Sequence, residues 1–439
     1  MHDQINSTIL PTGATVLTEH MPGLRSITIG IWVKRGSRHE AAKVNGISHF
    51  IEHTVFKGTR RRSALDIAIE SDRLGGHLDA YTSHEVTGFA LKVADTALAP
   101  AFDLLIDMVL DPRFDENDLR LEQKVIIEEM KMVEDTPEEY LAELFNSAYF
   151  PDHPLGRPIE GTEETVSAFD GMVTRKWHHL AYDPHNLIIA AAGNINHSQV
   201  VALVEKATTF RPNSSADSSV ISNGLAADAH AALESIDEKP QPAAPILVMR
   251  KKGLEQAHLI LASPWPDSRN DDRYAASLLA SVIGGGTSSR LWQSIREERG
   301  LAYSVGAATS TFMDIGVFQV YAGTSPKQID AVIDLTLLEL RRVVEKAVSA
   351  DEMRLVKDQA ISSILLGLES SSARAGSLAR QEIVHRRRIS PEEVIERLEL
   401  VTPEEMQRIA RHNFQTEKIA LAVIGELNGF KAERSRLEI

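Results

Sequence analysis

The stretch GISHFIEHTVFKG, from Gly46 to Gly58, carries two histidines and a glutamate close together. On a helix, His49 and His53 lie about 40° apart around the axis, so both imidazoles can bind one metal ion. Glu52 lies one turn from His49, where a general base could take a proton from an attacking water. The pattern is H-x-x-E-H, the reverse of the more common H-E-x-x-H zinc motif. It requires a third ligand from elsewhere in the chain.

The sequence before the motif predicts a rigid support for it. A strand is indicated by alternating Ile27, Ile29, Ile31 and Val33, and a polar loop separates this strand from a helix that Gly58 closes. A site on a rigid helix is held more accurately than one on a loop. Histidines four residues apart also occur on ordinary amphipathic helices, so surface or core histidines are the alternative at this point.

The composition is that of a soluble globular protein. The chain has 439 residues, 43% hydrophobic and 25% charged, and is long enough for two domains. A net charge of −15 argues against a nucleic-acid partner and suits basic or neutral peptides. Cysteine is absent, so a metal must be held by histidine and carboxylate. The sequence shows no signal peptide and no apolar run of about 18 residues, so we expect a cytoplasmic protein without a membrane partner.

A carboxylate-rich helix is predicted for ENDLRLEQKVIIEEMKMV. Glu122 and Glu129 are seven residues apart and share one face of it, while Glu128 points elsewhere. A solvated acidic face with nearby lysines as ion-pair partners is the alternative interpretation.

An internal repeat indicates duplication. SRHEAAKVNGISHFIEHTVFKGT, beginning at Ser37, resembles SRNDDRYAASLLASVIGGGTSSR, beginning at Ser268, at an offset of 231 residues. The motif's two histidines and glutamate correspond to Ala280, Ile283 and Gly284, so the second copy lacks the metal chemistry. Each half contains hairpins followed by long helices, without strict strand–helix alternation. We predict an α+β fold of two homologous units, each a mostly antiparallel sheet with helices packed on it.

The predicted domain boundaries follow from this repeat. Between the halves the composition shifts to Ser, Ala, Asn, Asp and Pro, as is typical of a linker. We assign residues 1–210 to an N-terminal metal-binding domain, residues 211–244 to the linker, and residues 245–439 to a homologous C-terminal domain without a metal site.

Besides HFIEH, the chain contains FKGT shortly after it, two glutamates seven residues apart, HPLGRPIEG and AAAGN. Together these motifs resemble the insulinase and pitrilysin family of zinc peptidases over nearly the whole chain. The similarity is greatest to its short branch, which includes the mitochondrial processing peptidase β subunit and bacterial processing proteases. The resemblance implies a zinc-dependent endopeptidase, built as half of a clamshell, that hydrolyses peptides or unfolded segments.

The resemblance also implies the metal ligands. A third zinc ligand is expected 76 residues after the second motif histidine, which selects Glu129 over Glu128. Glu122 then corresponds to the family's second carboxylate, which supports catalysis from behind the ligands. With His49 and His53, this set leaves one zinc position open for water, as in catalytic sites.

The implied substrate contacts begin with a hairpin. The segment from Gly76 to Phe89 corresponds to an edge strand that pairs with an extended substrate, through Asp79, Ala80 and Tyr81. Asp79 stands where the family commonly has Asn, which puts one side-chain contact in doubt but leaves backbone pairing possible.

The second half contributes a further implied contact. In IREERGLAYSV, Arg296 and Tyr303 correspond to family residues that hold the substrate, although a helix-surface arginine and a core tyrosine would fit the same spacing. Long family members join four homologous units around the substrate, and this chain has two. We therefore expect a homodimer, or a heterodimer with a related subunit, in which Arg296 and Tyr303 of one chain face the metal site of the other.

Two other functions are compatible with the sequence. Some relatives are non-catalytic scaffold or partner subunits, but these typically lose the His and Glu set that this chain retains. A peptidase dedicated to one precursor would carry the same catalytic residues as a general oligopeptidase.

Overall fold

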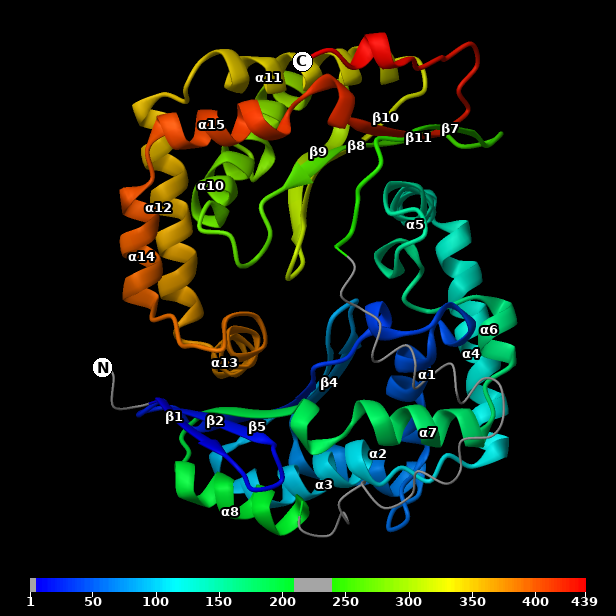
Figure 1. Cartoon of the computed structure of the whole chain (residues 1–439), viewed down its shortest axis with the longest axis vertical. Helices are drawn as coiled ribbons and strands as arrows, with labels where there is room; N and C mark the ends of the chain where they lie inside the picture. The colour runs from blue at the N-terminus through cyan, green and yellow to red at the C-terminus, as the bar shows by residue number, and fades with distance from the viewer. Residues whose placement is uncertain (1–4, 209–238) are drawn as a thin grey trace. The chain divides into compact units, whose positions relative to one another are not determined.

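The computed structural model describes residues 5–208 and 239–439 (Figure 1). Most of the predicted linker, residues 211–244, lies outside these ranges. Within them no helix is both long and apolar enough to cross a membrane. The described residues form two compact units: unit 1 comprises residues 5–131, 157–208 and 366–388, and unit 2 comprises residues 132–156, 239–365 and 389–439.

Unit 1 is built on a six-stranded sheet with the order β1-β2-β6-β3-β5-β4. Its strands are β1 (Ile5–Ile9), β2 (Thr15–His20), β3 (Ser26–Val33), β4 (His77–Thr82), β5 (Thr87–Ala94) and β6 (Leu187–Gly193). Only the β2 and β6 pair is parallel. The central strands β3 and β6 are buried along almost their whole length, because helices cover both faces of the sheet.

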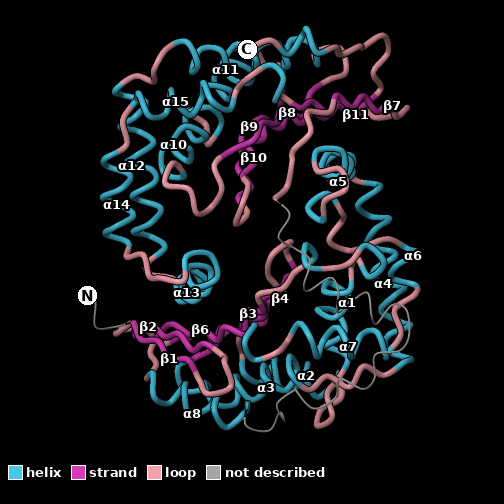
Figure 2. The backbone as a smooth tube through the Cα atoms, in the orientation of Figure 1, coloured by secondary structure: helices cyan, strands magenta, loops and turns pink. Residues whose placement is uncertain are grey.

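Helices of unit 1 lie on both faces of this sheet (Figure 2). One face carries most of them: α1 (Ile47–Thr54), α2 (Ala64–Leu74), α3 (Leu98–Leu110), α4 (Glu116–Asp135), α6 (Glu163–Ser167), α7 (Gly171–Ala181) and α8 (His197–Thr208). The other face is covered by α13 (Ser371–His385), which packs on β2, β3 and β6. The metal motif therefore lies on a helix of the larger layer.

Unit 2 has a five-stranded sheet with the order β7-β11-β8-β10-β9. Its strands are β7 (Ile246–Arg250), β8 (Ala257–Trp265), β9 (Ala302–Thr311), β10 (Gly316–Thr324) and β11 (Ala420–Gly425). The α-helices of unit 2 that the structure describes are α5 (Pro137–Tyr149), α10 (Arg273–Gly284), α11 (Ile329–Glu345), α12 (Ala350–Gly367), α14 (Pro391–Leu400) and α15 (Pro403–Asn413). The core forms between this sheet and α10, α11 and α15, and α5 covers the opposite face.

The two sheets confirm the predicted duplication of an α+β unit. The order β2-β6-β3-β5-β4 in the first matches β7-β11-β8-β10-β9 in the second, with one parallel pair at the corresponding place. Every other pair in both sheets is antiparallel. The first sheet adds β1 at its edge.

The compact units differ from the linear domains 1–210 and 245–439 by an exchange of helices. Helix α5 of the first half packs on β8 and β11 of unit 2, and α13 of the second half packs on the sheet of unit 1. Each of these helices buries apolar side chains, among them Phe145 and Leu378, in that contact. The exchanged helix covers the second apolar face of each sheet. Sequence periodicity shows that a helix has an apolar face, but it does not show on which sheet that face packs.

Candidate metal centre

Helix α1 begins at a buried and well-bonded N-terminus. Gly46, just before the helix, has φ 94°, a conformation that favours glycine. The buried carboxylate of Glu40 accepts the backbone N–H of Gly46 at 2.7 Å and that of Ser48 at 2.8 Å. It thus satisfies amides that the first turn leaves without intrahelical partners.

The loop that carries the HPLGRPIEG motif packs closely against the residues just before α1. A Cβ on Gly46 would lie 2.4 Å from a carbonyl oxygen of this loop, and a Cβ on Gly161 would lie 2.4 Å from the carbonyl oxygen of Asn45. Arg157 Nη2 donates to the carbonyl of Glu40 at 2.7 Å. The glycines therefore allow two backbone segments to approach closely, and the loop fixes the start of the motif helix.

We expect Glu40→Gln to destabilise this helix start. Glutamine keeps one acceptor oxygen and places an NH₂ group toward a buried backbone donor, which costs about 1–3 kcal/mol. The thermal midpoint of the metal-free protein should fall by about 2–12 °C. Glu164→Gln, at an exposed position, is the control and should leave the midpoint unchanged. Equal midpoints for the two variants would show that Glu40 is not needed as a cap.

The structure brings His49, His53 and Glu129 together. Their ligand atoms all lie within 4.8 Å of one another. Glu129 Oε2 is 3.9 Å from His49 Nε2 and 3.6 Å from His53 Nε2. The histidines come from α1 and the glutamate from α4, so packing of two helices of unit 1 assembles the group.

This donor set fits a zinc ion. Ligands about 2.0–2.1 Å from a tetrahedral zinc lie roughly 3.4 Å apart, slightly closer than these atoms. Glu129 Oε2 is buried and has no hydrogen-bond partner among the described groups, so it is available to a cation. Burial, assisted by the charge of His53, lowers the pKa of His49 to about 3, which keeps this imidazole neutral. Two histidines and one carboxylate leave a fourth position open, as in catalytic zinc sites.

Glu122 orients the second histidine from behind. Its Oε1 lies 3.1 Å from His53 Nδ1. Burial raises the pKa of Glu122, but the bond to His53 and the charge of Lys57 outweigh burial and leave this pKa lowered. An ionised carboxylate only accepts hydrogen bonds, so His53 Nδ1 donates and Nε2 faces Glu129.

Glu52 lies beside the two candidate histidine ligands on α1, and a residue of the edge strand holds its carboxylate. Thr82 Oγ1 at the end of β4 donates to Glu52 Oε2 at 2.6 Å. Burial raises the pKa of Glu52, and the Thr82 bond opposes that shift. The carboxylate is therefore fixed next to the donor set without belonging to it. Sequence reasoning assigned no role to Thr82, because nothing along the chain links residues 52 and 82.

The predicted hairpin is present, and β4 is an edge strand of the sheet. Side chains alternate along β4: Asp79 and Tyr81 are exposed, and Ala80 packs toward the core. The Tyr81 hydroxyl accepts a hydrogen bond from Trp32 Nε1 at 3.1 Å. The hydrogen bonds of Tyr81 and Thr82 thus fix the position of β4 beside Glu52.

Arg296 and Tyr303 lie together in unit 2. The Arg296 guanidinium is 4.0 Å from the ring centroid of Trp292 and 5.0 Å from that of Tyr303. Tyr303 is 79% exposed, so the alternative of a core tyrosine is wrong. The half-buried Arg296 and the exposed Tyr303 thus form a cation–π pair.

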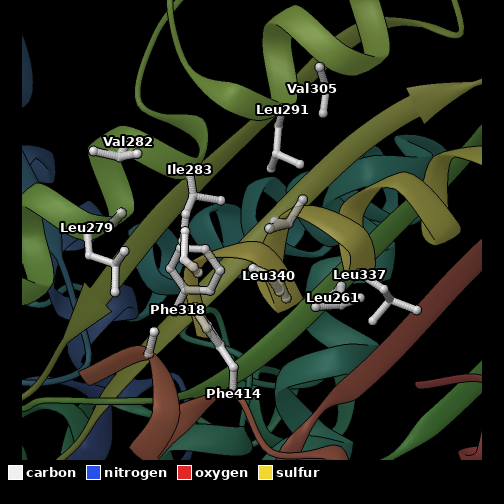
Figure 3. Close-up of a cluster of buried hydrophobic side chains, with 14 of the residues drawn as sticks. Leu261, Leu279, Val282, Ile283, Leu291, Val305, Phe318, Leu337, Leu340 and Phe414 are labelled. Carbon is white, nitrogen blue, oxygen red and sulfur yellow. The ribbon is translucent and has the colours of Figure 1, made fainter. Parts of the chain in front are cut away.

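At the second copy of the motif, core packing occupies the positions that correspond to the metal-binding residues. Ala280, Ile283 and Gly284 lie on α10, and Ile283 lies beside Phe318 in the core of unit 2 (Figure 3). A Cβ on Gly284 would be 2.4 Å from the backbone nitrogen of Ala307. No side chain fits at that position without displacing β9, so a histidine there is excluded.

Two histidines, a buried carboxylate oxygen and an adjacent glutamate form a candidate metal centre of the kind found in metal-dependent hydrolases. The chain belongs to the insulinase family, peptidase family M16. The family model described as insulinase (peptidase family M16) matches residues 15–163, which hold this centre. A second, described as the peptidase M16 inactive domain, matches residues 173–360, which include the filled second motif.

Individual relatives support this family over nearly the full chain. An uncharacterized zinc protease of Streptomyces coelicolor is 37% identical, covering 98% of this chain and 91% of the relative. One from Bacillus subtilis is 36% identical, covering 94% and 96%. The fold matches a protease structure from Helicobacter pylori with a TM-score of 0.84 at 20% identity, covering 96% of this chain and 99% of that one.

Proposed function

We propose that this protein is a zinc-dependent endopeptidase that hydrolyses peptides or unfolded segments. The observation that carries this proposal is the group of His49, His53 and Glu129 with Glu52 fixed beside it. Zinc bound there would supply a Lewis acid that acidifies water and polarises the peptide carbonyl. The family membership and the names of the relatives support the same chemistry.

Glu52 has the role of general base in this proposal. The Thr82 hydroxyl occupies one carboxylate oxygen, and the other can accept a proton from the attacking water. Glu52 would then return this proton to the leaving amine when the peptide bond breaks. A pKa raised by burial suits both transfers, because it lies closer to neutral pH than that of an exposed glutamate.

The proposed substrate is an extended chain that adds a strand to β4. Backbone hydrogen bonds along Asp79, Ala80 and Tyr81 would bind it with little dependence on sequence. Strand addition requires a segment without its own tertiary contacts, so a compact folded domain should be a poor substrate. Arg296 and Tyr303 are proposed to hold the substrate as well, and a homodimer that supplies them from a second chain stays a prediction.

The metal assignment is tested by a pair of adjacent glutamates on α4. Glu129→Gln should lose most of the bound zinc, because a neutral amide is a much weaker ligand. Glu128→Gln is the matched control, since the Glu128 side chain is 71% exposed and pairs with Lys131 at 2.7 Å.

Elemental analysis of both purified variants and the original protein gives the result. We expect about one zinc per chain in the original and in Glu128→Gln. Full zinc content in Glu129→Gln would place the third ligand elsewhere. Peptidase activity that survives complete removal of zinc by a chelator would contradict the proposed function.

A further inference from the structure

Lys57, in the FKGT motif after α1, makes a close ion pair with a residue of the metal centre. Its Nζ lies 2.6 Å from Glu122 Oε2. The Glu122 side chain is only 5% exposed, and its other oxygen contacts His53 Nδ1. One buried carboxylate therefore joins a lysine to a metal-binding histidine.

We propose that Lys57 is a positioning residue of the metal centre, which acts through Glu122 to orient His53 toward zinc. The inference rests on the proposed function and deepens it. Among the described residues, the ion pair of the Lys57 side chain is with Glu122, so its effect on the metal passes through this carboxylate.

The physical reason is the number of contacts that hold the carboxylate. With Lys57 present, each oxygen of Glu122 has its own partner, so the carboxylate plane is fixed and the His53 ring is fixed with it. Without the lysine, Glu122 would keep one hydrogen bond and could turn about its last torsion. Loss of the lysine would also leave the buried charge of the Glu122 carboxylate without its cation, which is energetically unfavourable.

His49 has no comparable support. Its Nδ1 is buried and lacks a hydrogen-bond partner among the described residues. Among the described residues, the hydrogen bond with a second side chain therefore orients His53, through the Glu122 and Lys57 contacts. This makes zinc affinity sensitive to a residue that is not a ligand.

The test measures zinc dissociation constants by competition with a chelating dye. Lys57→Met keeps the side-chain length and removes the charge, and it should weaken zinc binding about tenfold. Lys57→Arg should restore affinity to within about threefold of the original. Lys124→Met is the matched control, because Lys124 is exposed on α4 and has no ion pair among the described residues. It should bind zinc as tightly as the original protein.

A double-substitution cycle separates positioning from general stability. Glu122→Gln should weaken zinc binding about 10- to 100-fold, and Lys57→Met added to it should change affinity less than about threefold. The inference is overturned if Lys57→Met binds zinc as the original does. An equal loss with and without Glu122, together with a lowered thermal midpoint of the metal-free protein, would indicate a merely structural lysine. Failure of the original protein to bind zinc would instead refute the proposed function, and this inference with it.

Discussion

Replacing Glu52 with glutamine is expected to abolish peptide hydrolysis and to leave zinc binding intact. The glutamine amide does not take up a proton, and a positioned general base contributes about 10²–10⁴-fold to the rate. We therefore expect kcat/KM on an unstructured fluorogenic peptide to fall by about three orders of magnitude. Glu52 is not one of the three grouped ligands, so metal analysis should find the same zinc content as in the original protein.

This result separates the catalytic proposal from a scaffold role. Glu128→Gln serves again as the control and should retain full activity, because Glu128 is exposed on a different face of α4. If Glu52→Gln keeps more than about a tenth of the activity, another residue is the base. If the original protein with zinc bound cleaves no unfolded or peptide substrate, a non-catalytic subunit becomes the better interpretation.

Separating the two halves of the chain is expected to prevent each from folding alone. A fragment of residues 1–208 would lack α13, and a fragment of residues 239–439 would lack α5. Each sheet would then expose an apolar face that includes, in the first half, Trp32 and Ile188. Exposed apolar faces of this kind cause association or unfolding. Co-expression should give a stable complex of both fragments, because each regains its missing helix.

Size-exclusion chromatography and circular dichroism of the fragments provide the measurement. Alone, each fragment should aggregate or show a weak unfolding transition, and together they should elute as one species with a single set of folded spectra. A control in the intact chain is Ala379→Asp, which places a charge in the same contact and should lower the thermal midpoint. Two monodisperse fragments that do not associate would show that the exchanged helices are dispensable.

Local patterns in the chain were enough to single out several residues of the candidate site. His49, Glu52 and His53 are three or four residues apart, and any α-helix places residues at this spacing on neighbouring turns of one face. The repeat at 231 residues predicted two related units, and the matching strand orders confirm it. Both features can be recognised without the structure because they depend on residues close in sequence, or on a comparison of the chain with itself.

Family resemblance was needed to select the candidate for a third ligand. Spacing within α4 placed Glu122 and Glu129 on one face but left a solvated acidic surface as an alternative. The count from His53 selected Glu129, and packing of α1 against α4 in the structure brings it within 3.6 Å of that histidine. Helical periodicity predicts which residues share a face of the helix. It does not predict which other element of the fold packs against this face.

The remaining contacts were decided by tertiary structure alone. Thr82 meets Glu52, Lys57 meets Glu122, and α5 and α13 pack on the sheets of the opposite halves. Residues 30 or more positions apart form the two side-chain contacts, so no local propensity encodes them. They arise because apolar faces and buried charges must find partners when the sheets and helices pack, and that choice is made by the whole fold.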